Sequence, residues 1–149
     1  MKKSSFTFIF VLIATMTFAQ KPIIKTDQAP NPIGPYSQAV EANGLVFVAG
    51  QIGLNPETRQ LATGGVEAET AQIMENIKAI LRAANLSMDN IVNTTIYIKD
   101  LSGFPKVNEV YGKYFTGNFP ARATVGADNL PGGAGVEIAV IAVRGPRKK

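Results

Sequence analysis

The sequence predicts an α+β domain in which two helices cover one face of a mixed β-sheet. Three observations lead to this fold class. The chain has 149 residues, enough for one domain, and 46% of them are apolar, which supports a packed core without cross-links. A helical stripe of apolar residues lies near the middle of the chain. Alternating or β-rich runs lie before and after it, so the order is strands, helix, strand, helix, strands.

Residues 1–19 have the pattern of a secretion signal. Two lysines precede an apolar stretch from Phe6 to Phe18, and Thr17-Phe18-Ala19 provides a small-x-small cleavage pattern. The stretch is shorter than the ~20 residues that a membrane span needs. We expect cleavage after this tripeptide, no stable membrane span afterwards, and export to a periplasm or the exterior. The mature chain is then a single domain over 20–149 with a short basic tail at 144–149. An uncleaved anchor or a buried first helix is the alternative.

The first half of the mature chain predicts a loop, a strand and a long helix. Residues 28–36 contain three prolines and one glycine, which is typical of an ordered loop. Leu45–Ala49 is a β-rich run that is closed by Gly50. From Val66 to Ala84 the apolar residues follow a helical stripe, with acidic residues near its start and basic residues near its end. Asn85 is a left-handed C-cap for this helix.

The second half predicts a strand, a second helix and two final strands. Residues 91–99 alternate, which places one set of side chains on a buried face: Val92, Thr94, Ile96 and Ile98. A helix is expected over 104–115 with Ser102 as its N-cap. Arg122–Ala127 and Val136–Val143 are the last two strands.

Two absences in the composition limit the chemistry. The chain has no Cys, which excludes disulfides, a thiolate nucleophile and Cys-ligated metal centres. It also has no His, which excludes Ser-His-Asp and Cys-His machinery. The glycine pairs lack the strand–turn–helix spacing of a phosphate loop. Catalysis must depend on carboxylates, Arg, Lys, Tyr, hydroxyls, backbone groups and water, and we expect no metal and no cofactor.

The net charge of +4 does not predict nucleic-acid binding. Two lysines lie in the predicted signal, and four basic residues lie in the C-terminal tail. Residues 20–143 then contain 9 Lys and Arg against 11 Asp and Glu. Binding to phosphates needs a cationic face, and the part of the chain expected to fold provides none. We expect no nucleic-acid partner.

Glu137 is the one carboxylate in the apolar strand 136–143. Alternation places it on the same strand face as Ile141 and Val143. It could be solvated on an exposed sheet face. However, the two apolar neighbours indicate that this face is also covered, and with the helices on the opposite face a second subunit is the natural cover.

Arg122 is the one cation in the two final predicted strands. It forms either a surface ion pair or a bidentate clamp for a carboxylate, a role that the planar guanidinium suits. Arg122 and Glu137 lie on the last two strands, so they could line one pocket as an anion anchor and an acid–base group. Tyr36 is a donor in a cleft or a packing ring, and Asn108 is a ligand contact or a helix-surface polar residue. Gly50 permits close approach of a ligand or backbone, or forms an ordinary bulge.

Seven strings that occur in order along the chain resemble the Rid (YjgF/RidA) family. They extend from about residue 29 to residue 143: Ile33-Gly-Pro-Tyr-Ser-Gln-Ala39, Val48-Ala-Gly-Gln-Ile-Gly53, Lys99-Asp-Leu, Val107-Asn-Glu-Val-Tyr111, Phe119-Pro-Ala-Arg122, Leu130-Pro and Val136-Glu-Ile138. The resemblance implies a chorismate-mutase-like fold that forms a homotrimer with ligand clefts between subunits. It also implies hydrolysis of reactive 2-imino and enamine acids, such as 2-iminobutanoate and 2-iminopropanoate, to 2-keto acids and ammonia.

The resemblance also implies roles for individual residues. Arg122 would hold the substrate carboxylate, and Glu137 would position water. Four further positions would line the pocket: Tyr36, Gly50, Asn108 and Thr124. Thr124 stands where Cys is frequent, Ala49 where many members have Ser, and Asp128 where a small or basic residue is usual. These departures concern the substrate range of the pocket.

A non-catalytic protein is the alternative. Some members of the family are proposed to be trimeric binders of small carboxylates or holdase-like proteins. A binder needs the arginine but not the glutamate, so the presence of both Arg122 and Glu137 favours the enzyme. The imine carbon is already electrophilic, and water therefore needs only orientation and modest help from a base.

Overall fold

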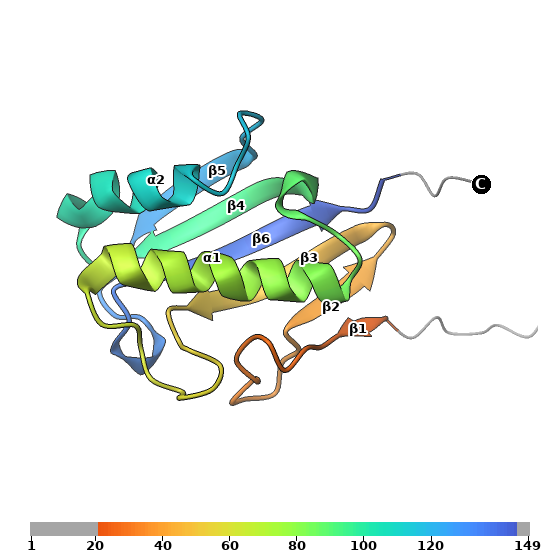
Figure 1. Cartoon of the computed structure of the whole chain (residues 1–149), viewed down its shortest axis with the longest axis horizontal. Coiled ribbons are helices and arrows are strands. Elements are labelled where there is room, and N and C mark those ends of the chain that lie inside the picture. Colours follow the sequence, from red (N-terminus) through yellow and green to blue (C-terminus); the bar gives the residue numbers. More distant parts are fainter. Residues whose placement is uncertain (1–20, 146–149) are drawn as a thin grey trace, which may run out of the picture.

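The computed structural model describes residues 21–145, which form a six-stranded sheet with two α-helices on one face (Figure 1). The strands are β1 (Ile23–Ile24), β2 (Ala39–Ala42), β3 (Leu45–Ile52), β4 (Ile91–Ile98), β5 (Ala121–Gly126) and β6 (Val136–Val143). The helices are α1 (Gly65–Ala83) and α2 (Phe104–Gly112). The predicted α+β class is confirmed. The predicted signal at 1–19 and most of the basic tail lie outside the described residues.

The sheet is mixed, as predicted. Its strand order is β1-β2-β3-β6-β4-β5, and each neighbouring pair is antiparallel except β4 with β5. A parallel pair needs a crossover connection, and α2 supplies it between β4 and β5. This order places β4 between β5 and β6, the two strands that carry Arg122 and Glu137.

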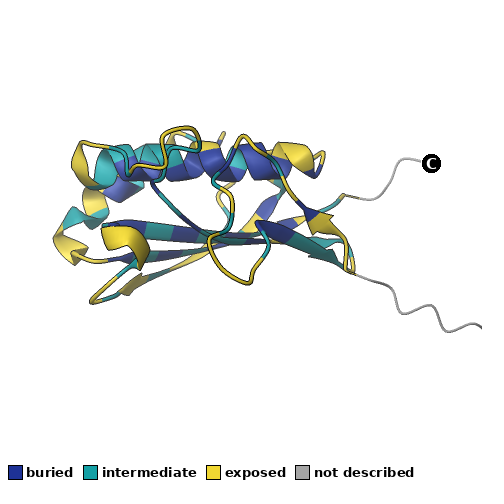
Figure 2. Ribbon diagram, turned by 90° about the horizontal axis from the view of Figure 1, so that it is seen from below, coloured by how far each residue is buried: buried dark blue, intermediate teal, exposed yellow. Residues whose placement is uncertain are grey.

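The core lies between the helices and one face of the sheet (Figure 2). The predicted stripe of α1 is confirmed, because Ile73, Ile77 and Ile80 are fully buried. From the sheet, β6 contributes every second residue to this core: Val136, Ile138, Val140 and Ala142. Asn85 follows α1 with a left-handed φ of 56°, as expected for the residue that ends the helix.

The other face of the sheet is apolar, and residues 21–145 of the same chain leave it uncovered. Phe47 of β3 lies opposite Ile141 of β6, and Leu45 lies opposite Val143. Phe47 and Val143 are each 38% exposed, and Ile141 is half-buried. We call these four residues the open face. Glu137 lies on the same side of β6 as Ile141 and Val143, as the alternation predicted.

Two predicted boundaries and one predicted side-chain direction were wrong, each for a local reason. β3 does not close at Gly50 but continues to Ile52, because a bulge lets the strand pass through the glycine. A second register shift between Ile91 and Asn93 leaves Val92 exposed, and Ile91 takes the buried position instead. The helix predicted over 104–115 ends at Gly112, after which tighter turns continue the path and still bury Phe115.

The predicted N-cap at Ser102 was also wrong. The residue before α2 is Gly103, and Asp100 instead caps the short 3₁₀ turn Leu101–Gly103 by accepting a hydrogen bond from the Ser102 backbone N–H at 2.9 Å. Strands β1 and β2 were not predicted. No helix within residues 21–145 combines the length and apolarity needed to cross a bilayer.

Candidate active site

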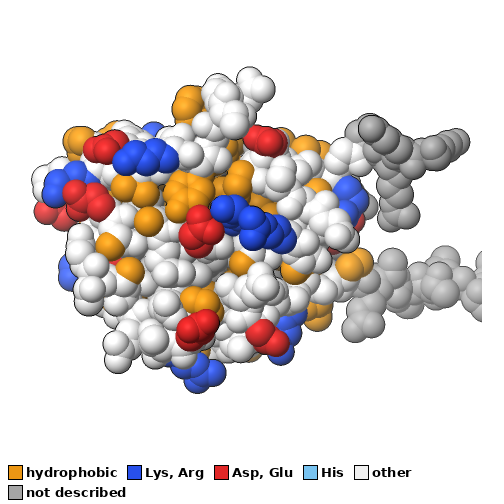
Figure 3. All heavy atoms as spheres, in the orientation of Figure 1, with side chains coloured by type: hydrophobic (Ala, Val, Ile, Leu, Met, Phe, Trp, Pro, Cys, Tyr) orange, Lys and Arg blue, Asp and Glu red, His pale blue; other side chains and the backbone are white. Residues whose placement is uncertain are grey.

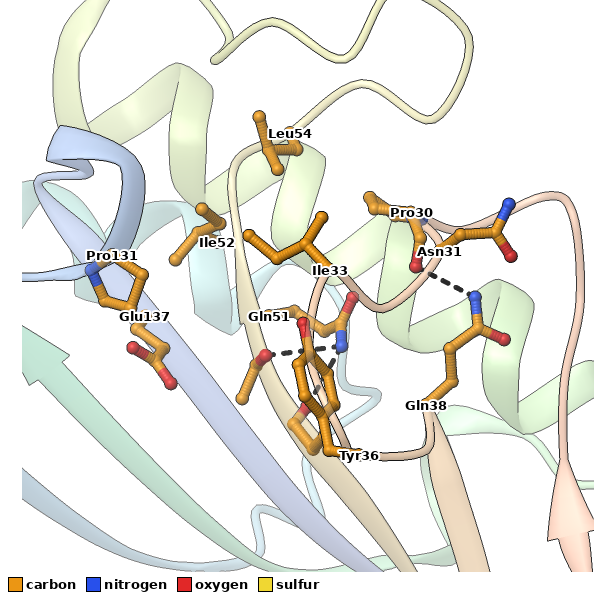
Figure 4. Close-up of a pocket in the computed structure, with 12 residues that line it drawn as sticks. Pro30, Asn31, Ile33, Tyr36, Gln38, Gln51, Ile52, Leu54, Pro131 and Glu137 are labelled. Carbon is orange, nitrogen blue, oxygen red and sulfur yellow. Dashed lines mark hydrogen bonds between the residues drawn. The ribbon is translucent and has the colours of Figure 1, made fainter.

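The predicted site residues fall into two separate pockets of the chain. The first, here called the Glu137 pocket, has a volume of about 460 Å³. It lies among residues 28–36, here called the proline-rich loop, the end of β3 and the start of β6. Apolar and polar side chains line it: Pro30, Asn31, Ile33, Tyr36, Gln38, Gln51, Ile52, Leu54, Pro131 and Glu137, together with Ala49 and Gly50. Figure 4 shows Glu137 beside Pro131 at one end, and Ile33 and Tyr36 farther along.

Glu137 is the half-buried acid of this pocket. No residue of the part of the chain that the structure describes donates a hydrogen bond to its carboxylate or forms an ion pair with it. Burial raises the pKa of Glu137 above the usual glutamate value, since desolvation penalises the charged form. A carboxylate without a protein partner that faces a pocket is available for a proton or a water molecule.

Gly50 is required by the position of this carboxylate. A Cβ atom added at Gly50 would overlap Oε1 of Glu137 and lie 2.8 Å from its Cδ. The close approach expected at this glycine is therefore real, and in this chain a carboxyl group makes it. The bulge that was the alternative is present as well. Val48 pairs with Val140 and Gln51 with Ile138, so Ala49 and Gly50 lie opposite the single residue between those partners.

Tyr36 reaches the pocket from the proline-rich loop, and its ring is 52% exposed. The loop is held by Gln38, which is 2% exposed and was not singled out from the sequence. Its Nε2 donates to the carbonyl oxygens of Thr26 at 2.9 Å and Pro30 at 2.9 Å, and its Oε1 accepts from the Thr26 N–H at 2.7 Å. Gln38, two residues after Tyr36 in the sequence, thereby anchors the loop that carries this tyrosine.

Two side chains of helix α1 bind the segments that follow β3 and precede β6 beside the Glu137 pocket. Asn76 Nδ2 donates to the Leu54 carbonyl at 2.9 Å, just after β3. Glu69 Oε2 accepts from the Gly135 N–H at 2.9 Å, just before β6. Both side chains are buried, at 1% and 8% exposure. A polar residue on the buried side of an amphipathic helix is the sequence signal that could have identified them.

The second pocket, here called the Arg122 pocket, has a volume of about 410 Å³ and lies between α2 and β5. Its lining residues are Asn108, Tyr111, Gly112, Phe119, Pro120 and Arg122. The Arg122 guanidinium carbon lies 5.0 Å from the centre of the Tyr111 ring and 5.6 Å from that of Phe104. Arg122 is exposed and has no carboxylate partner within residues 21–145. The rings hold the cation in place, and its hydrogen-bonding edge has no partner among the described residues.

Asn108 lies in the same pocket as Arg122. Its Oδ1 atom is buried and has no hydrogen-bond partner among the described residues, which is unfavourable for a polar atom. The Tyr111 hydroxyl donates to Thr94 Oγ1 at 3.0 Å. Burial raises the pKa of Tyr111, and the Thr94 contact and the Arg122 charge oppose that change, so the phenol stays protonated near neutral pH.

The expectation that Arg122 and Glu137 line one pocket was wrong for a single chain. β4 separates their strands. Arg122 pairs with Thr94, which faces the helices, whereas Glu137 pairs with Tyr97, which faces the other way. The two charged groups therefore lie on opposite faces of the sheet.

The remaining pocket predictions divide between the two sites. Tyr36, Gly50 and Ala49 line the Glu137 pocket, and Asn108 lines the Arg122 pocket. Thr124 is half-buried, two residues beyond Arg122 on β5, but it lines neither pocket within one chain. Asp128 is exposed after β5 and also lines neither pocket.

The charged surface of the described residues is mixed. Figure 3 shows Lys and Arg side chains interspersed with Asp and Glu on the helix side. Several basic residues pair with carboxylates: Lys78 with Glu75, Lys106 with Glu67, Lys113 with Glu109 and Arg144 with Glu41. Within residues 21–145, no three Asp or Glu side chains gather as metal ligands would.

Comparison with known proteins gives the family. Residues 26–144 match the model of the family described as endoribonuclease L-PSP. A mouse protein named 2-iminobutanoate/2-iminopropanoate deaminase is 45% identical over 126 residues, which cover 85% of this chain and 93% of the mouse protein.

Two solved structures share the fold. The Rid family protein YyfA from Yersinia pestis is 46% identical with a TM-score of 0.81, and the match covers 83% of this chain and 99% of that one. RidA from an Antarctic Psychrobacter is 42% identical with a TM-score of 0.79, covering 82% and 98% of the two chains. The chain belongs to the endoribonuclease L-PSP family, which is the Rid (YjgF/RidA) family that its motifs resemble.

Proposed function

We propose that this chain is a hydrolytic deaminase of reactive 2-imino and enamine acids of the 2-iminobutanoate and 2-iminopropanoate type. The observation that carries the proposal is Glu137, a half-buried carboxylate with a raised pKa, without a protein partner, held against Gly50 in a pocket. The name of the mouse relative supports the same reaction. The substrate is a small zwitterion, and the chain offers a free cation and a free carboxylate, one for each end.

The site is complete only when two copies of the chain meet. Arg122 of one copy and Glu137 of a neighbour form one cleft, and three copies form a closed homotrimer. Two observations support this arrangement. The open face is apolar and uncovered in one chain, and the two charged groups lie in separate pockets on opposite faces of the sheet. Large uncovered apolar surfaces are typical of subunit contacts.

In this site Arg122 binds the substrate carboxylate through two parallel hydrogen bonds. Its contact with the Tyr111 ring holds the guanidinium in place and leaves its outer edge for the ligand. Asn108, whose Oδ1 lacks a partner, accepts a hydrogen bond from the ligand or from water in the same cleft. The Tyr36 hydroxyl donates from the other side.

Glu137 orients a water molecule toward the iminium carbon and takes one of its protons as the C–O bond forms. Glu137 then returns the proton to the carbinolamine nitrogen, the C–N bond breaks to release ammonia, and Glu137 takes the hydroxyl proton as the carbonyl of the 2-keto acid forms. That last proton leaves with the ammonia as ammonium, so Glu137 ends the cycle ionised. One water is consumed and no electrons are transferred to or from the substrate. The carbon is electrophilic from the start, so positioning supplies most of the acceleration.

The direct test is to generate 2-iminobutanoate in situ and to follow its loss with and without the mature protein. Faster loss that depends on Arg122 and Glu137 supports the proposal. Calorimetric binding of a 2-keto acid without any turnover would instead make the chain a binder of small carboxylates.

We also propose that the protein is exported by the segment 1–19. Mass spectrometry of protein collected outside the cytoplasm should give a chain that begins at Gln20. A chain that begins at Met1 would overturn this proposal.

A further inference from the structure

Gln51 has a position in the Glu137 pocket that the proposed reaction does not use. It follows the two bulged residues of β3, and its side chain is 6% exposed. Its Nε2 donates back to the carbonyl oxygens of Ala49 at 3.0 Å and Gly50 at 3.4 Å (Figure 4). A side-chain amide that binds both carbonyls of a bulge fixes the bulge from within, because the extra residue interrupts the ladder of backbone hydrogen bonds.

The bulge in turn determines where the Glu137 carboxyl group can lie. Oε1 of Glu137 occupies the space that a Cβ atom of Gly50 would fill, so the carboxyl group rests directly on the Gly50 backbone. A second contact holds the bulge from the side of β2. The Ala49 N–H donates a hydrogen bond to the carbonyl of Gln38, the residue before β2, at 2.9 Å. Together with this outer contact, the Gln51 amide holds the peptide that supports Glu137.

We propose that Gln51 is a positioning residue, which acts through the Ala49–Gly50 bulge to hold the Glu137 carboxyl group in its half-buried place. The proposal rests on the proposed function for its kinetic consequence but not for its structural one. Without the amide donors the bulge relaxes, water reaches the carboxyl group, and the base loses both its fixed direction and its desolvation. Binding of the substrate carboxylate, which Arg122 of the neighbouring copy supplies in the shared cleft, should be little affected.

The pKa of Glu137 reports how far water reaches its carboxyl group, because few titratable groups face it. Tyr36 comes from the proline-rich loop and Tyr97 from β4, and they are the titratable side chains that face it from neighbouring elements. β3 and the short 3₁₀ turn Pro131–Gly133 contribute no titratable side chain to the pocket. Burial is the single cause of the raised pKa of Glu137, so entry of water should bring that pKa back toward the usual glutamate value.

The kinetic test uses Gln51→Met, which keeps the length of the side chain and removes its donors. We expect kcat to fall about tenfold or more while KM changes less than about threefold. Thr70→Val is the matched control, because the Thr70 hydroxyl is also buried and also donates to a backbone carbonyl, at 2.6 Å to Val66, but it lies in α1 away from both pockets. The Thr70→Val control should have a lower free energy of unfolding but an unchanged kcat.

A double-mutant cycle separates positioning from general support of the fold. In a Glu137→Gln background, Gln51→Met should have almost no further effect on kcat, because the group through which it acts is gone. An equal fold-loss in both backgrounds would overturn the proposal. So would a Gln51→Met enzyme that melts earlier yet keeps the wild-type kcat.

A measurement on the unmodified chain covers the case in which Gln51→Met does not fold. The ¹⁵N–¹H signals of the Gln51 side-chain amide should shift with pH along the titration of Glu137, which ¹³C-labelled glutamate reports independently. The shift should vanish in Glu137→Gln. Amide signals that ignore the Glu137 titration would overturn the proposal. This readout needs no turnover, so a chain that fails the imine assay can still confirm or refute the role of Gln51.

Discussion

Arg122 and Glu137 have charges that no other residue between 21 and 145 neutralises. Each is instead fixed by an uncharged surface: Arg122 by the Tyr111 and Phe104 rings, and Glu137 by the bare backbone of Gly50. A structural salt bridge would satisfy both groups and leave nothing for a ligand. Two unpartnered, positioned opposite charges are what a small zwitterion with a carboxylate and an iminium group requires.

Arg122→Ala should lose about 3 kcal/mol of transition-state binding, which is about 10²-fold in kcat/KM, because two charge-assisted hydrogen bonds disappear. Arg122→Lys should recover little of this loss, since an ammonium group can neither form the bidentate contact nor stack flat on Tyr111. Steady-state kinetics of imine hydrolysis and calorimetry with a 2-keto acid on the same variants test this. Wild-type kcat/KM in Arg122→Ala would remove Arg122 from the site.

The raised pKa of Glu137 predicts the pH dependence of turnover. Glu137 is a base only when ionised, so the acid limb of kcat/KM should lie above about pH 4.3, the usual glutamate value. Glu137→Gln keeps the shape of the side chain but cannot titrate. It should lower kcat by about 10²-fold and abolish this limb while binding of a 2-keto acid survives. A variant with an unchanged acid limb would show that another group is the base.

The raised pKa of Glu137 also determines the direction in which the free energy of unfolding changes with pH. Folded Glu137 keeps its proton to a higher pH than the unfolded chain, so its contribution is present below the ordinary glutamate pKa. That contribution is lost as the pH rises through the folded pKa. The free energy of unfolding of the wild type, compared with that of Glu137→Gln, should therefore fall as the pH rises across this window. Urea denaturation of both proteins at several pH values measures the difference.

At the scale of elements, α1 and the β3 bulge shape the Glu137 pocket. Asn76 binds the chain after β3, and Glu69 binds the chain before β6, so a single rigid helix determines the distance between the two walls. The bulge then turns the strand so that Gly50 meets Glu137. These contacts link residues far apart in the sequence, and none of them follows a local period.

Asn76→Ala should lower the free energy of unfolding by about 2 kcal/mol, because it leaves the Leu54 carbonyl without its donor in a buried place. Gln72→Ala is the control: Gln72 donates to Asn76 Oδ1 at 2.9 Å but is only half-buried, so its loss should cost clearly less. Urea denaturation compares the two. Equal losses would mean that the Leu54 contact contributes nothing of its own.

The difference between local sequence periods and contacts distant in the sequence explains which parts of the fold could be predicted. Long periodic segments such as α1 and β6 were predicted to within a residue, because their apolar faces repeat over many residues. Strands β1 and β2 have two and four residues, too few for a period to be recognised. Val92 was misplaced because a register shift reverses which residues face the core, and no local pattern marks that shift.

The site was predicted as a set of residues but not as an arrangement. Glu137 and Arg122 stood out because each is a lone charge in an apolar or strand-forming run. Their separation depends on β4 lying between β5 and β6, and strand order is a property of the whole sheet. Gln38 and Gln51 were not distinguished from surface glutamines, since their backbone partners come from loops and a bulge rather than from a motif.

For the molecule as a whole, the proposed shared site requires association of the chains through the open face. Phe47 lies opposite Ile141 on that face and is 38% exposed in a single chain. Phe47→Glu should convert the proposed trimer to monomers at micromolar concentration and abolish turnover, because a charge cannot be buried there without a partner. Arg82→Glu, which places a carboxylate on the exposed surface of α1, is the control and should remain trimeric. A monomeric wild type in light scattering would contradict this arrangement.

Subunit complementation tests most directly whether one active site takes Arg122 from one copy and Glu137 from the next. Arg122→Ala and Glu137→Gln are each expected to be nearly inactive, and they are refolded together in equal amounts. Random mixing in a closed trimer creates sites with both native residues at about one quarter of the positions, so the mixture should regain about one quarter of wild-type activity. A mixture no more active than the two separate variants would contradict a shared site.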